Sequence, residues 1–219
     1  MSYIDAYAHI YQKIQGFKIK IYAPKNKFYT GYLSLEPSTR STYDIAMRDA
    51  TIDGLITMDN IEKLKPGQLF YREINPNEKF ILQSVNQFEH QTYTRNVNAI
   101  KQNSTIVVKR IQYDEESCEN IYKTIYDDIV SFVTMQNKDE KNFQAGIEDN
   151  TVISIQIPKR DLEDKLYIIN NGDKIILKNL EGDLIRHIKI ESVDEFGVPC
   201  IIRIYGTYET RTGKWYVTI

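Results

Sequence analysis

The feature that most restricts the fold is a succession of short motifs that occurs twice, in the same order. The matching pairs, in chain order, are 10–31 and 125–146, 51–58 and 151–158, Gly67 and Gly172, 80–88 and 188–196, Arg95 and Arg203, and 107–111 and 215–219. Collinear matches with gaps only at loops rarely arise by chance, so they predict a tandem duplication. The 219 residues then divide into two domains of about 110 residues, 1–111 and 112–219.

Each half is expected to begin with a helix and to continue in strands. Apolar residues recur at helical spacing between Ile4 and Ile14, and again between Ile121 and Val133. Short runs rich in Ile, Val, Tyr and Thr follow, with alternation in KFILQSV and RHIKIESV and turn signals such as KPG and NNGD between them. The predicted fold class is mainly β with some α (α+β). It comprises two tandem related small β-barrel or sandwich domains, each preceded by a helix.

The two halves differ most at an insertion in the first, the loop 32–50. Between Gly31 and Thr51 the chain reads YLSLEPSTRSTYDIAMRDA, whereas between Gly146 and Thr151 it reads only IEDN. Long loops cost little extra closure entropy, so a tolerated surface insertion is one interpretation. The other is an arm that docks on a partner, because a long loop with its own apolar residues must bury them somewhere. The candidate contact residues on this arm are Arg40, Tyr43, Ile45, Met47 and Arg48.

Composition argues against several classes of protein. Hydrophobic residues at 42% and charged residues at 26% describe a globular chain that can bury a core. A net charge of -2 argues against a generic binder of polyanions. No apolar run approaches the roughly 20 residues that span a bilayer, and the N-terminus lacks a secretory apolar region. The sequence therefore predicts a protein that is made in cytosol and has no membrane partner.

The sequence shows no arrangement that indicates catalysis. Its three histidines have no metal-ligand spacing, and neither GxxxxGK[ST] nor GxGxxG occurs. Cys118 and Cys200 have no CxxC partner and are predicted to be buried free thiols. The acidic run 114–116 is predicted to lie at the N-terminus of the second helix, where carboxylates favour the helix dipole. We therefore expect a protein that is not an enzyme, with no cofactor and no metal site.

One segment resembles a known family. QIPKRDLEDKLYIINNGDKIIL, followed by IRHIKIESVDEF, is similar to tailed-bacteriophage head-closure (stopper) proteins and to related connector and tail-completion proteins. In those proteins a small β-barrel carries a segment of the type D-x-I/V … G … Y/I-x-I-x-S-V-D, in which a hairpin leads into a strand and a turn. The resemblance covers roughly residues 150–200, with a weaker echo over 50–90. The tandem arrangement departs from the usual single-domain stopper.

The resemblance implies a virion structural protein that is assembled in the host cytoplasm. Phage connectors are closed rings in which heterologous contacts close by rotation, and a loop or strand edge of one barrel contacts its neighbour. The implied partners are other copies of the chain and neighbouring portal, connector or tail proteins. DNA would at most pass through the lumen. The loop 32–50 would be the first candidate for contact with an adjacent ring.

A second hypothesis is a tandem β-barrel module that binds single-stranded nucleic acid. Such modules stack bases on aromatic rings and contact phosphates with basic side chains. The stretch TYTRNVNAIKQNSTIVVKR, residues 92–110, interleaves both kinds of residue. Alternating charges on a strand also prevent edge pairing, so a structural interpretation is open as well. The candidate nucleic-acid-binding residues are Tyr93, Arg95, Lys101, Lys109 and Arg110.

Overall fold

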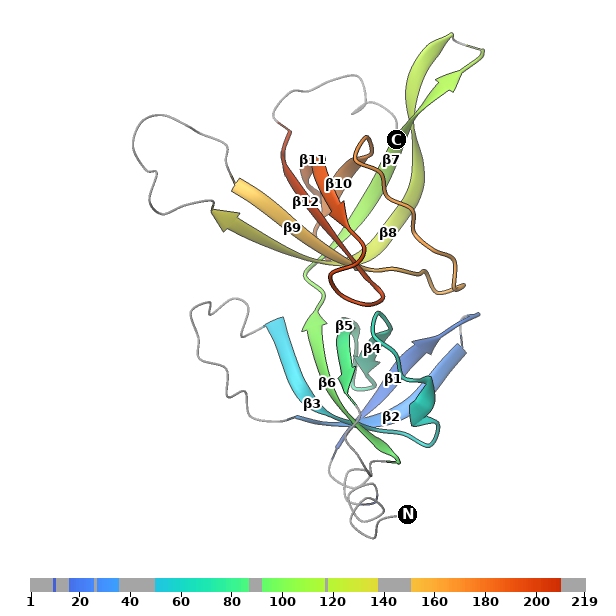
Figure 1. The fold of residues 1–219 in the computed structure, drawn as a ribbon, viewed down its shortest axis with the longest axis vertical. Coiled ribbons are helices and arrows are strands. Elements are labelled where there is room, and N and C mark those ends of the chain that lie inside the picture. Colours follow the sequence, from blue (N-terminus) through green and yellow to red (C-terminus); the bar gives the residue numbers. More distant parts are fainter. Residues whose placement is uncertain are drawn as a thin grey trace. The chain divides into compact units, whose positions relative to one another are not determined.

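The chain forms two closed six-stranded β-barrels (Figure 1). The computed structural model describes residues 10, 16–25, 27–35, 50–86, 92–116, 118–137 and 151–209. The first barrel contains β1 (Phe17–Ala23), β2 (Lys27–Leu35), β3 (Thr51–Thr57), β4 (Leu69–Arg72), β5 (Asn75–Asn86) and β6 (Thr94–Lys101), with the short 3-10 helix η1 (Ile61–Lys63). The second contains β7 (Ser104–Asp114), β8 (Glu119–Asn137), β9 (Thr151–Pro158), β10 (Lys174–Lys178), β11 (Leu184–Asp194) and β12 (Ile201–Tyr208). The predicted class, mainly β with two tandem barrels, is confirmed, and helix is a minor part of the described residues.

The two barrels share one topology. The first has the strand order β1-β2-β3-β6-β5-β4, and β4 closes on β1. The second has the order β7-β8-β9-β12-β11-β10, and β10 closes on β7. Adding six to each strand number of the first order gives the second. Closure pairs the edge strands of each barrel with one another, which removes the open edges of a flat sheet.

Two of the predicted repeat matches lie at equivalent places in the two barrels. Gly67 and Gly172 each stand two residues before the fourth strand of their barrel, β4 or β10. The segments 80–88 and 188–196 begin in β5 and β11. Both strands have a register shift at the matched place, after Leu82 and after Ile190. The repeated Ser-Val motif therefore marks a repeated β-bulge, which bends the strand in each barrel.

Two other matches identify the right strands in the wrong register. Thr51 and Thr151 begin the equivalent strands β3 and β9. When they are aligned, Ile56, a core residue of β3, falls on Gln156 of β9. The core residues of β9 are its neighbours Ile155 and Ile157. In β6, Asn96 rather than Arg95 occupies the place that Arg203 has in β12. Side chains of a strand alternate between its faces, so each one-residue error exchanges core and surface.

The helix predicted between Ile121 and Val133 is wrong, because these residues belong to β8. The apolar positions recur every four residues, and four is a multiple of the two-residue period of a strand as well as about one helical turn. The many β-branched and aromatic residues of this stretch favour the strand, which pairs with β7 and β9. The match of 10–31 with 125–146 fails with it, since β8 is equivalent to β2.

The helix predicted between Ile4 and Ile14 lies outside the described residues, except for Ile10, which is helical. Its partner in the second half does not exist, as β8 shows. A helix before each domain is therefore not a repeated feature of this chain.

The predicted domain boundary between residues 111 and 112 falls inside β7, the first strand of the second barrel. The stretch 107–111, interpreted as the closing strand of the first half, thus belongs to the second barrel. The chain leaves the first barrel at Lys101 and enters the second at Ser104. Two compact units result: Met1–Gln102 with Pro158–Leu166 and Val198–Ile201, and Asn103–Ile157 with Tyr167–Gly197 and Ile202–Ile219.

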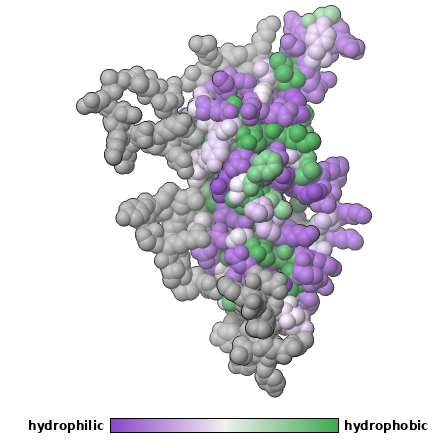
Figure 2. Space-filling view, viewed as in Figure 1, coloured by the Kyte–Doolittle hydropathy of each residue, from purple (hydrophilic) through white to green (hydrophobic). Residues whose placement is uncertain are grey.

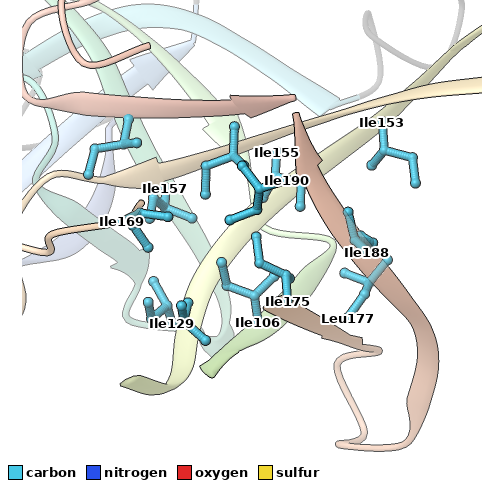
Figure 3. Packing of buried hydrophobic residues seen from close by; sticks show 13 residues of the cluster. Ile106, Ile129, Ile153, Ile155, Ile157, Ile169, Ile175, Leu177, Ile188 and Ile190 are labelled. Carbon is cyan, nitrogen blue, oxygen red and sulfur yellow. The ribbon is translucent and has the colours of Figure 1, made fainter. Parts of the chain in front are cut away.

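Each barrel is closed around its own apolar core. In the second barrel the inward positions are mostly isoleucine, and Ile153, Ile155 and Ile157 alternate along β9 with no exposed surface (Figure 3). In the first barrel Phe70 and Phe80 stack with ring centroids 5.1 Å apart. β-Branched side chains pack well on a pleated sheet, so the Ile-rich runs that predicted strands also fill the barrel interior.

A charged cluster joins three strands of the first barrel around Glu78. Arg72 donates a hydrogen bond to Glu78 Oε2, and Lys101 Nζ lies 2.6 Å from Glu78 Oε1. The Glu78 side chain is only 13% exposed. Desolvation by itself raises the pKa of Glu78, but the hydrogen bonds from Lys101 and Arg72 outweigh it and hold the pKa below its ordinary value of 4.5. The carboxylate therefore stabilises the fold in its charged form.

Replacing Glu78 by glutamine should weaken the first barrel in a pH-dependent manner. Because the folded pKa is lowered, the stabilisation is complete above about pH 4.5 and is lost as the pH falls through the folded pKa. We expect Glu78→Gln to reduce the free energy of unfolding by about 1 to 2 kcal/mol at pH 7. The variant should also lose less stability than the unmodified chain as the pH falls below about 4.5, because it has no carboxylate to protonate at this position. Urea unfolding of both proteins at pH 7 and at a pH below about 4.5 measures this difference. Equal pH dependence in the two proteins would refute it.

Candidate assembly surface

The hairpin of β7 and β8 is much longer than the barrel to which it belongs. β10 covers the outer edge of β7 only over Thr105–Lys109, and β9 covers that of β8 only over Phe132–Asn137. β7 and β8 nevertheless remain paired as far as Asp114 and Glu119. Figure 1 shows their hairpin end extending beyond the second barrel as a twisted two-stranded ribbon. We call residues 110–123 the ribbon.

The base of the ribbon is irregular. The β7–β8 register shifts between Ile106 and Val108 and again between Val108 and Lys109. In β8, Asp128 has a positive φ of 47°. Such bulges bend a strand and increase its twist. They explain why β7 and β8 leave the curvature of the barrel here and continue as a separate ribbon.

Both edges of the ribbon lack a neighbouring strand among the described residues. The backbone N–H and C=O groups along a strand edge can pair with a strand of another chain. Proteins usually shorten or cover such edges to prevent association. This chain instead extends its longest hairpin away from a closed barrel, which is typical of a contact element.

Arg110 anchors the ribbon to the body of the second unit. Its Nε and Nη2 donate hydrogen bonds of 2.7 Å to Oδ1 and Oδ2 of Asp173, and Nη2 also donates to the carbonyl of Ile168 at 2.8 Å. The Asp173 side chain is 1% exposed, and its Oδ2 also accepts a hydrogen bond from the backbone N–H of Asn170. The hydrogen bond that Arg110 donates to Asp173 raises the pKa of Arg110 despite partial desolvation. This bidentate ion pair fixes the position and the orientation of the charged guanidinium group.

Tyr126 provides a second anchor beside Arg110. Its ring meets that of Tyr167 edge-on, with centroids 5.0 Å apart. Its hydroxyl accepts a hydrogen bond of 3.1 Å from the backbone N–H of Ile168. One strand of the hairpin is thus tied to the segment 167–173 by Arg110 and the other by Tyr126, so that the ribbon is held at its base from both strands.

Large apolar side chains are exposed on the ribbon. Ile111 is 47% exposed and Tyr113 is 63% exposed. Both lie on the same face as Tyr122, because Ile111 pairs with Tyr122 across the hairpin and side chains alternate along each strand. Hydrophilic residues cover much of the described surface on the face that Figure 2 shows. An exposed apolar face on an open-edged ribbon is therefore typical of a contact surface.

The tip of the ribbon is acidic. Between residues 112 and 120 the chain carries four carboxylates and neither lysine nor arginine. The prediction that the run 114–116 caps a helix is wrong, because these residues end β7 and begin the hairpin turn. Glu115, Glu116 and Glu119 are exposed. A concentrated negative charge at the end of a projecting hairpin favours a positively charged contact surface.

The prediction that both cysteines are buried is also wrong. Cys118 lies in the turn of the ribbon and Cys200 in the turn before β12, and both are exposed. Each has a positive φ, 54° for Cys118 and 62° for Cys200. Tight turns run over the protein surface, so a thiol in such a turn stays accessible however apolar it is.

The five candidate residues of the insertion loop, Arg40, Tyr43, Ile45, Met47 and Arg48, lie outside the described residues. Their role as an arm that docks on a partner stays a prediction.

The five candidate nucleic-acid residues lie in both units. Tyr93, Arg95 and Lys101 belong to the first unit, and Lys109 and Arg110 belong to the second. Arg95 is 8% exposed and Lys109 is 6% exposed, whereas Lys101 and Arg110 pair with carboxylates. Buried or ion-paired cations are poorly placed to contact phosphates, so these positions give the nucleic-acid hypothesis no support, and it stays a prediction.

Within the described ranges, no group of three or more His, Cys, Asp or Glu side chains is placed to hold a metal ion. Among the same residues no helix has both the length and the apolar character needed to cross a membrane.

Comparison with known proteins adds little. No protein-family model matches the chain, and no curated protein matches it. A crystal structure of MrkH from K. pneumonia is similar over 96% of this chain and 85% of that chain, with 10% sequence identity and a TM-score of 0.21. A TM-score this low carries no argument about fold or function.

Proposed function

We propose that the chain is a non-enzymatic virion structural protein of a tailed bacteriophage. In this proposal it is a ring-forming connector, neck or tail-completion subunit that joins the portal or head to the tail. The observation that carries the proposal is the ribbon, an anchored hairpin with open edges and an exposed apolar face. The similarity of residues 150–200 to head-closure proteins supports the phage context.

A closed barrel with one projecting hairpin suits ring assembly for a mechanical reason. A subunit in a ring makes heterologous contacts: it offers one surface to the next copy and receives a different surface from the previous copy. The barrel supplies a stiff body, and the Arg110–Asp173 pair sets the direction of the ribbon at its base. Contacts of the same kind to portal, connector or tail proteins would place the ring in the particle, with DNA at most passing through the lumen.

The alternative, a tandem β-barrel module for single-stranded nucleic acid, makes a different use of the barrels. It requires exposed rings and free cations on one sheet face. At the residues predicted for it, Arg95 and Lys109 are buried. The nucleic-acid alternative is therefore not the favoured function, and the experiment described next can distinguish it from the proposal.

Negative-stain images of the unmodified chain at micromolar concentration test the proposal. We expect closed rings, together with oligonucleotide binding too weak to detect at physiological salt. Isolated single particles that bind oligonucleotides, and release them as salt is raised, would contradict the proposal and favour the alternative.

A further inference from the structure

A second surface, on the first barrel, has the opposite charge to the ribbon tip. Residues 17–35, which form the β1–β2 hairpin, contain four lysines and no aspartate or glutamate. Lys25 and Lys27 are exposed and form no ion pair with the part of the chain that the structure describes. The four lysines are Lys18, Lys20, Lys25 and Lys27. We call this surface, with the aromatic cluster described next, the hairpin face.

Lys18 and Lys20 are partly neutralised by one carboxylate. Their Nζ atoms lie 2.8 Å and 3.7 Å from the two carboxylate oxygens of Glu73. Lys18 and Lys20 lie on the same side of β1 as Tyr22, whereas Lys27 pairs with the buried Ala23 and starts from the other side at the exposed end of the hairpin. Four lysines beside one carboxylate leave the hairpin as a whole positively charged. Since the two unpaired lysines stand at its turn, the positive charge is concentrated at the exposed end of the hairpin.

The hairpin face also carries an aromatic cluster. The ring centroids of Tyr22 and Phe28 are 4.9 Å apart, and those of Tyr22 and Tyr71 are 5.7 Å apart. Phe28 is 48% exposed. Tyr71 lies opposite Lys20 in the β1–β4 register, so the rings share a face with that lysine. Aromatic rings are the side chains most enriched where protein interfaces are tightest.

We propose that the ribbon of one copy docks on the hairpin face of the next copy of the same chain. The acidic tip would meet the lysines, and Ile111 and Tyr113 would cover the ring of Phe28. This inference rests on the proposed function, which requires the chain to assemble with itself, and it names the two surfaces that meet.

Charge matching selects a second copy as the occupant. The ribbon tip carries Asp114, Glu115, Glu116 and Glu119, and the hairpin carries four lysines, so the two segments have equal and opposite formal charge. Each surface also has exposed apolar side chains near its charged residues: Ile111 and Tyr113 on the ribbon, and Phe28 on the hairpin face. Because the contact is heterologous, every subunit of a closed ring uses each surface once and leaves neither exposed.

Charge reversal at the two surfaces tests the contact. One variant reverses the tip with Glu115→Lys and Glu116→Lys, and the other reverses the hairpin with Lys25→Glu and Lys27→Glu. Each variant alone brings like charges together at the substituted positions and leaves its own segment with no net charge, so it should have the mass of one chain, 25.7 kDa, by light scattering. In an equimolar mixture the two variants can alternate, which restores opposite charges at each contact, so the mixture should form assemblies larger than either variant alone and, for an even-numbered ring, recover the unmodified mass. That recovery also shows that both variants are folded.

The matched control is Glu181→Lys with Glu191→Lys, two exposed carboxylates of the second unit outside the ribbon. It should keep the unmodified mass. If the unmodified chain assembles and either reversed variant assembles equally well, the proposed contact is wrong while the proposed function stands. A monomeric unmodified chain overturns the proposed function itself. If hairpin reversal abolishes oligonucleotide binding and leaves the mass unchanged, the hairpin face binds nucleic acid instead of a second copy.

Discussion

Asp173→Ala should destabilise the second barrel by about 2 to 4 kcal/mol. The substitution removes the two carboxylate acceptors of the Arg110 guanidinium, which keeps only the Ile168 carbonyl, and it removes the acceptor of the Asn170 backbone N–H. Arg110 is 29% exposed, so water replaces part of what is lost. The rest of the expected loss of stability is the cost of leaving the positive charge of Arg110 partly buried without its carboxylate partner.

Urea unfolding of the full chain measures this loss, and Glu181→Ala is the control. Glu181 is an exposed carboxylate of the same unit, so its removal should change the free energy of unfolding by no more than about 0.5 kcal/mol. A double variant, Arg110→Met with Asp173→Leu, removes both charges and should recover part of the stability. If Asp173→Ala costs no more than Glu181→Ala, Asp173 does not anchor the ribbon.

Gly206→Ala should have an effect of similar size for a steric reason. A Cβ at Gly206 would lie 2.5 Å from the carbonyl oxygen of Lys189 and 2.7 Å from Cγ2 of Ile188. The carbonyl belongs to β11, which pairs with β12 at this place, so relief requires the two strands to move apart. We expect a loss of about 2 to 3 kcal/mol.

Gly172→Ala provides the matched control in the same unit. A Cβ at Gly172 would meet nothing within 4 Å, and its φ is not in the left-handed region. The substitution should leave stability within about 1 kcal/mol of the unmodified chain. Thermal unfolding of both variants distinguishes the two sites. Equal melting temperatures would show that the close approach at Gly206 costs nothing.

The strands and the repeat were predictable where local pattern decides the structure. Alternation in KFILQSV and RHIKIESV matches β5 and β11, and the shared Ser-Val motif marks a bulge in both. The register of the other matches was less predictable. Thr51 with Thr151, and Arg95 with Arg203, resemble each other in sequence, but pairing across the sheet decides which residue faces the core.

The hairpin of β7 and β8 was not predicted, because the residues of β8 fit the periods of a helix and of a strand equally well. Ile121, Ile125 and Ile129 are four residues apart, which suits one face of a helix and one face of a strand. The acidic run 114–116 then resembled a helix cap. A better signal was available: two β-branched runs, 105–111 and 121–134, flank a short polar segment, which is the pattern of a hairpin. No local pattern predicts that such a hairpin continues beyond its barrel, since that depends on where β9 and β10 stop pairing.

The molar mass of the unmodified chain, determined by light scattering on a size-exclusion column at physiological salt, decides whether it assembles with itself. The proposal predicts a mass of several chains, an integral multiple of 25.7 kDa greater than one, that falls as salt is raised, because salt screens the charges of the ribbon tip and the hairpin face. A mass of one chain at every concentration and salt would contradict it.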